Sequence, residues 1–155
     1  MKYRSETQQN NSQGQGITEF ALILVFLLVL LAGIFDIGRA FFAYMIIRDA
    51  AQEGAVYGSI APKSDLGAFQ TAVADRVEAA YLDPSNPSET PLNIDNVNIQ
   101  VQILGSGCAA PGNSVRVSVD YQFPLAMPFL GAIIGKQTID MSAAAEDSIL
   151  SPICP

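Results

Sequence analysis

The sequence contains no histidine, and only 15% of its 155 residues are charged, against about 25% in an ordinary soluble domain. The missing histidine excludes Ser-His and Cys-His nucleophile pairs and every histidine-based metal site. Basic residues are also few, because 8 Lys and Arg stand against 15 Asp and Glu, which gives a net charge of −7. A nucleic-acid-binding protein needs a basic face, so we expect no nucleic acid among the partners.

The residue patterns that catalysis would need are missing as well. The sequence has no glycine-rich phosphate-binding loop and no spaced carboxylate pair in a recognisable frame. Glu146 and Asp147 are adjacent acids, which is more typical of a solvated strand end than of a calcium site. The two cysteines, without histidine, make a poor zinc site. We therefore predict that the chain is not an enzyme, with no catalytic residues, no cofactor and no metal.

One long apolar run lies near the N-terminus. Phe20 to Phe35 contains no charged residue, and counting from Ile17 extends the run to about 19 residues with Glu19 as its only interruption. As a helix with a rise of 1.5 Å per residue it spans roughly 28 Å, which is close to the hydrocarbon thickness of a bilayer. Because the run is apolar on every face, a membrane span over about residues 17–37 is favoured over a buried core helix.

The flanks of this run predict its orientation. Lys2 and Arg4 precede it, so the positive-inside rule places the N-terminus in the cytoplasm and the rest of the chain outside, although Arg39 and Arg48 beyond the run oppose this. A cleaved secretory signal peptide fits poorly, because the polar lead is long and a glutamate stands at the entrance of the run. We expect a single-pass membrane protein with an extracytoplasmic head.

The most informative residue is Glu19, because a carboxylate inside a membrane helix is costly and usually has a partner or a functional role. The local sequence Gly14-Gln15-Gly16-Ile17-Thr18-Glu19-Phe20 leads directly into the apolar run. It resembles the processing site of type IV prepilins, in which a peptidase cuts after a glycine and a glutamate follows at the fifth mature position. The alternative is that Glu19 only marks a helix start, where acids favour the helix dipole.

The resemblance implies cleavage between Gly14 and Gln15, which makes residues 1–14 a leader peptide. Gly16 is a second glycine, but a cut after it would place Glu19 at the third position. In the family, the glutamate neutralises the N-terminal amine of a neighbouring subunit as subunits enter a filament. Two charges that satisfy each other cost less than two charges left alone in lipid.

The following stretch narrows the resemblance to one family. The strings TEFALIL, DIGRAFFAY and RDAAQEGAVYG follow one another within about positions 14–58. In this order they resemble the N-terminal pattern of TadE-like proteins, the minor pseudopilins of tight-adherence (Tad) pili. The resemblance implies a minor pilin that acts in pilus assembly and adhesion. The alternative is a single-pass membrane-anchored extracytoplasmic binding module unrelated to filaments.

The resemblance also implies a set of partners. These are the prepilin peptidase, other pseudopilins, the major pilin, the assembly platform in the inner membrane, and the lipid bilayer itself. The resemblance also implies that the chain can be incorporated into a pilus.

A single pilin-like helix is expected over about residues 15–60, with its first half in the membrane, and Pro62 ends it. Asp36 and Arg39 are spaced i, i+3 and can pair on one helix face, as an ordinary surface ion pair or as an inter-subunit contact. Small residues recur on nearly one face and can pack against the chain's own head or between subunits. They are Ala43, Ala50, Gly54 and Gly58.

Residues 61–155 are predicted to form a small α+β head. Ser64 or Asp65 can cap a helix that runs to about Leu82, and 84–96 is expected to be an exposed loop. Three segments then alternate apolar and polar residues, which indicates an antiparallel sheet with one wet face and a helix on the other. The apolar positions of the helix are Leu66, Phe69, Val73, Val77 and Tyr81, and the strands are expected at 97–103, 115–123 and 139–146.

Two features of the head leave alternatives open. The apolar segment 124–135 is too short to span a bilayer, so it either covers one end of the core or forms an exposed patch for a partner subunit or the membrane surface. Cys108 and Cys154 can form a disulfide if the head is outside the cytoplasm, and free thiols or partner contacts are the alternatives.

Overall fold

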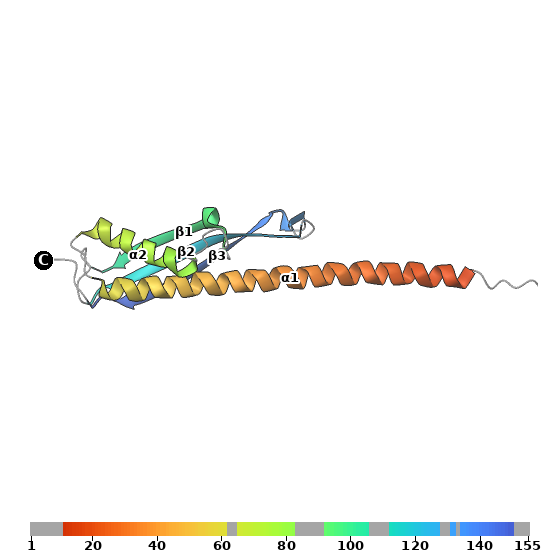
Figure 1. The fold of residues 1–155 in the computed structure, drawn as a ribbon, viewed down its shortest axis with the longest axis horizontal. Coiled ribbons are helices and arrows are strands. Elements are labelled where there is room, and N and C mark those ends of the chain that lie inside the picture. Colours follow the sequence, from red (N-terminus) through yellow and green to blue (C-terminus); the bar gives the residue numbers. More distant parts are fainter. Residues whose placement is uncertain are drawn as a thin grey trace, which may run out of the picture.

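The computed structural model describes residues 11–61, 65–82, 92–105, 112–127, 131–132 and 134–150. Figure 1 shows one long helix that lies with its C-terminal half against the head, while its N-terminal half projects beyond it. The α+β class and the long N-terminal helix predicted from the sequence are confirmed. The elements are α1 (Asn11–Ile60), α2 (Leu66–Tyr81), the short 3₁₀-helix η2 (Ile94–Asn96), β1 (Val97–Leu104), β2 (Ser114–Pro124) and β3 (Thr138–Ser148).

The first half of α1 is apolar and uncovered. Its large apolar side chains from Ile17 to Leu31 are between 40 and 74% exposed, so in this fold the helix is not a core helix. It is long and apolar enough to be a single membrane span. The helix begins at Asn11 rather than near Gln15, so it runs through the predicted processing site.

The three strands form an antiparallel sheet in the order β1-β2-β3. Val101 pairs with Val117 on one side of β2, and Val119 pairs with Ala143 on the other. Helices α1 and α2 cover one face of the sheet (Figure 1). The alternation predicted for the central strand is confirmed, because the side chains that face the helices are all buried. They are Val115, Val117, Val119, Tyr121 and Phe123.

The small residues of α1 let it approach the sheet closely. Ala43 and Ala50 are buried in the core. A Cβ atom at Gly54 would collide with the side chain of Val77, and one at Gly58 would lie 3.1 Å from Val115. The small-residue stripe therefore packs against the chain's own head, which decides between the two alternatives that the sequence left open.

Helix α2 begins as predicted. Asp65 is its N-cap, and its Oδ2 accepts a hydrogen bond of 3.0 Å from the backbone N–H of Ala68. Four of the five predicted apolar positions are buried, whereas Leu66 is exposed. Leu66, in the first turn of α2, instead borders an open groove beside the C-terminal end of β1.

The loop predicted over 84–96 needs a correction at its end. Leu92 is fully buried and joins the core, and residues Ile94–Asn96 form η2. The side chain of Asn93 caps η2 by accepting a hydrogen bond of 3.2 Å from the N–H of Asp95. A single buried leucine and one 3₁₀ turn give no periodic pattern, so nothing in the sequence marked them.

Candidate functional site

The predicted processing site lies in the exposed first turns of α1. All residues from Gly14 to Phe20 are exposed, and a Cβ atom added at Gly14 or Gly16 would meet no atom within 4 Å. The hydroxyl of Thr18 donates a hydrogen bond of 2.8 Å to the carbonyl of Gln15. Residues 1–10, the larger part of the predicted leader, lie outside the described residues. No described side chain covers the glycines of this site.

Glu19 stands alone on an apolar surface. Within the described ranges of the chain, its carboxylate makes no ion pair and no side-chain hydrogen bond. The residues one turn further along the same helix face are Leu22 and Ile23, and both are largely exposed. Among residues 11–150 that the structure describes, none provides a counter-charge for this carboxylate.

Asp36 has the opposite environment. Its side chain is only 2% exposed, and Oδ2 accepts a hydrogen bond of 2.9 Å from the backbone N–H of Met127 in the segment that follows β2. Oδ1 lies 3.3 Å from Nη1 of Arg39. The carboxylate is thus shared between its own helix and the head, and it is not part of an ordinary surface ion pair.

Arg39 completes this junction. Its guanidinium carbon lies 5.3 Å from the ring centroid of Phe123, near the end of β2, which is within the range of a cation–π interaction. The side chain is 42% exposed, so water screens part of both interactions. We call Asp36, Arg39, Phe123 and Met127 the junction. The sequence pointed to Asp36 and Arg39, but it gave no sign of their contacts with Phe123 and Met127.

Part of the segment 124–135 covers the core, which is the first of the two alternatives predicted for it. Leu125 packs against the core and donates its N–H to the carbonyl of Gln137 at 2.9 Å, which closes the β2–β3 hairpin. Ile134 is 53% exposed. Residues 128–130 and 133 of this segment, like Cys108 and Cys154, lie outside the described residues.

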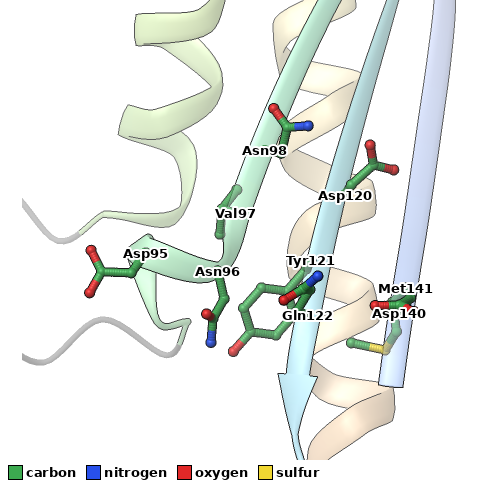
Figure 2. A pocket seen from close by; sticks show the side chains of 9 residues that line it. All are labelled: Asp95, Asn96, Val97, Asn98, Asp120, Tyr121, Gln122, Asp140 and Met141. Carbon is green, nitrogen blue, oxygen red and sulfur yellow. The ribbon is translucent and has the colours of Figure 1, made fainter. Parts of the chain in front are cut away.

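Beside η2, the sheet carries an open depression of about 430 Å³. Asp95, Asp120 and Asp140 border it from η2, β2 and β3, and Figure 2 shows that they stand apart and do not converge. The hydroxyl of Tyr121 accepts a hydrogen bond of 3.4 Å from the N–H of Asn93. In the part of the chain that the structure describes, no three acidic side chains are close enough to hold a metal ion.

Tyr81, at the end of α2, is the described residue of the head whose pKa is clearly shifted. Burial, and secondly the negative charge of Glu78, raise the pKa of Tyr81 above its ordinary value of 10.0. Its hydroxyl therefore stays protonated at neutral pH, and Tyr81 is a core residue and not a reactive group.

The comparison with protein families concerns the helix just described. Residues 14–56 match the model of the family described as TadE-like protein. This segment is TadE-like. The match confirms the family that the sequence pattern predicted, and it implies a protein associated with the Tad pilus. It starts at Gly14, contains both Glu19 and Asp36, and includes none of the sheet. No curated protein and no solved structure matches the chain.

Proposed function

We propose that this chain is a minor pilin, or pseudopilin, of a Tad-type pilus that acts in pilus assembly and adhesion. In this proposal α1 holds it in the inner membrane with the N-terminus in the cytoplasm and the head outside. A prepilin peptidase cuts it between Gly14 and Gln15. The observation that carries the proposal is Glu19, a carboxylate that lies on an apolar helix surface and has no partner in the described chain.

A second chain can supply what Glu19 lacks. Cleavage after Gly14 creates a positive α-amino group at Gln15, and an isolated amine at the edge of lipid is as costly as an isolated carboxylate. Pairing the amine of one subunit with Glu19 of its neighbour costs less than leaving both charges isolated in lipid. The TadE-like match from Gly14 onward supports this role for the segment.

The first turns of α1 suit a peptidase substrate. Gly14 and Gly16 each cost a helix roughly 1 kcal/mol relative to alanine. No described side chain packs on either glycine, so no tertiary contact opposes local unwinding. The segment can therefore open into the extended form that a peptidase needs, while the apolar helix that follows stays in the membrane.

The face of α1 that points away from the head suits contacts between subunits. This face stays apolar for about three turns beyond the apolar run. Over the same turns, the opposite face of α1 is covered by the head. Exposed apolar side chains of this kind favour packing against another apolar helix. The residues are Ile37, Phe41, Phe42 and Met45.

The test is the mature N-terminus, measured by mass spectrometry of the protein from membrane fractions of pilus-forming cells. We expect loss of residues 1–14 in the wild type and in Gly16→Leu, and an uncut chain in Gly14→Leu. The Gly16→Leu variant is the matched control, because both glycines are equally exposed. Glu19→Ala should be cut normally and be depleted from filaments.

Two results would contradict the proposal. A Gly14→Leu chain that is still shortened by the leader would show that the processing site is wrong. A wild-type chain that keeps Met1 in assembled pili would favour a simple membrane-anchored binding module instead.

A further inference from the structure

We propose that the tip of the β2–β3 hairpin is a second membrane contact, which rests on the phospholipid headgroup layer beside α1. The hairpin tip is defined here as residues 125–127, 131–132 and 134–137. This inference rests on the proposed placement of α1 across the membrane, and it assigns a lipid-facing surface to the head, which the TadE-like match does not reach.

The position of the hairpin tip along α1 is the first argument. The hydrogen bond from Met127 N–H to Asp36 Oδ2 fixes the tip at Asp36, which is the first charged residue after the run that ends at Phe35. Figure 1 shows that the described residues between β2 and β3 extend along α1 toward its N-terminal half, beyond the ends of β1 and α2. With α1 upright in a bilayer, this is the part of the head nearest to the lipid.

The height agrees with bilayer dimensions. The run from Ile17 to Phe35 spans roughly 28 Å and fills a hydrocarbon core of about 30 Å. Asp36 then lies at the outer boundary of the hydrocarbon. The headgroup layer adds only about 5–8 Å on each side, and the hairpin tip, held at Asp36, lies within that layer.

The chemistry of the hairpin tip suits this layer. Ile134 is 53% exposed and the side chain of Lys136 is 67% exposed. The described tip residues include no Asp or Glu, in a chain whose net charge is −7. Lys136 lies 3.6 Å from Asp140, but both are exposed, so this pair is weak. An apolar side chain beside a lysine that can reach lipid phosphate is typical of membrane interfaces.

The helix surface at the same height is of the same kind. Ile34, Phe35 and Ile37 are all more than half exposed on α1, and the partly exposed guanidinium of Arg39 lies just above them. The hairpin tip therefore extends the apolar belt of α1 sideways and adds Lys136 to Arg39. Lipid contact at two places would fix the height and the rotation of the subunit before it enters a filament.

A tryptophan scan tests the inference, because the chain contains no tryptophan of its own. Three full-length variants are placed in phosphatidylcholine–phosphatidylglycerol vesicles in which the lipid is brominated either near the headgroup or near the chain end. Ile134→Trp probes the hairpin tip and Ile23→Trp the middle of the span. Gln102→Trp is the matched control on an exposed strand position, at the end of β1 that pairs with Arg116, away from the tip.

We expect Ile134→Trp to lose most of its fluorescence with the headgroup-side bromines and little with the chain-end bromines. Ile23→Trp should show the reverse, and Gln102→Trp should respond to neither. The last variant also tests whether a new tryptophan by itself draws an exposed site into lipid. Adding Asp36→Ala to Ile134→Trp should reduce the quenching, and Asp36→Asn, which keeps an acceptor for Met127 N–H, should retain it.

This experiment distinguishes a failure of the lipid contact proposed for the hairpin tip from a failure of the proposed membrane placement of α1. If Ile134→Trp behaves like Gln102→Trp while Ile23→Trp is quenched, α1 spans the membrane but the hairpin tip faces water or another protein, and the inference is overturned. If Ile23→Trp is not quenched, the membrane placement of α1 fails and the inference falls with it. Quenching that is unchanged by Asp36→Ala would overturn the role given to Asp36.

Discussion

Replacing Asp36 by alanine tests the junction between α1 and the head. The change removes a charged acceptor from Met127 N–H, at 2.9 Å in a buried place. A hydrogen bond to a charged group contributes about 1.5–3 kcal/mol. The ion pair to Arg39 adds at most about 1 kcal/mol, because the arginine is 42% exposed and screened by water. We expect Asp36→Ala to lower the free energy of unfolding of the head by about 2–3 kcal/mol.

The matched variants separate these contributions. Asp36→Asn keeps an acceptor for Met127 and loses the charge, so its loss should be about 1 kcal/mol. Arg39→Ala removes the ion pair together with the contact over Phe123, which is worth about 0.5–1 kcal/mol at a partly exposed site. It also leaves the buried carboxylate without its counter-charge, so we expect a cost between those of the two Asp36 variants.

Denaturant unfolding of the full chain in detergent micelles, followed by tyrosine fluorescence, measures these differences. The change in signal reports on the head to the extent that it comes from Tyr81 and Tyr121, which are buried there, because the chain has no tryptophan and the exposed Tyr44 of α1 changes its surroundings less on unfolding. A change below about 0.5 kcal/mol in Asp36→Ala would refute the reasoning, since it lies within the range of neutral surface substitutions. An Asp36→Asn variant as unstable as Asp36→Ala would show that the charge, and not the acceptor, holds the junction.

Two further predictions concern the core of the head. Gly54→Ala should destabilise the head by about 1–3 kcal/mol, because the added methyl group overpacks against Val77. Gly38→Ala is the control and should not destabilise it, because a Cβ atom there meets nothing within 4 Å. Equal melting temperatures of the two variants would contradict the close approach of α1 to the sheet. Because the pKa of Tyr81 is raised in the folded state, the unfolded chain loses this proton first. The stability that Tyr81 contributes should therefore be complete below about pH 10 and be lost as pH rises through the higher folded pKa. Urea titrations should show that the free energy of unfolding falls less above pH 10 in Tyr81→Phe than in the wild type. If the two proteins lose the same free energy of unfolding as pH rises, the prediction is wrong.

The sequence predicted those parts of the fold that have a local period. Phe69, Val73 and Val77 recur at helical spacing and are all buried, because a helix face is determined by residues within a few positions of one another. The same holds for the alternating strands. Leu92 was missed because one buried residue after a proline-containing stretch has no period to reveal it.

The candidate site also has one part that the sequence could reveal and one part that it could not. The pattern from Gly14 to Glu19 is linear, so it could be recognised without a structure. The contact between Asp36 and Met127 joins residues 91 positions apart, and no spacing rule connects them. The sequence therefore predicted the pairing of Asp36 with Arg39 but not the burial of the carboxylate under the head.

Under the proposed function, the two carboxylates at the ends of the apolar run would let one helix both hold the head and take part in assembly. Glu19 and Asp36 are about 25 Å apart along α1, at opposite ends of a surface that is apolar on every side. The fold satisfies Asp36 through Met127 and Arg39, whereas no described residue forms an ion pair or a side-chain hydrogen bond with Glu19. A carboxylate that already has its partners holds the head to the helix in a free subunit, whereas one that has none favours any arrangement that brings it a positive charge. Under the proposed function, the stability of the subunit and its tendency to assemble would be set by different residues of the same helix, so that each could change without the other.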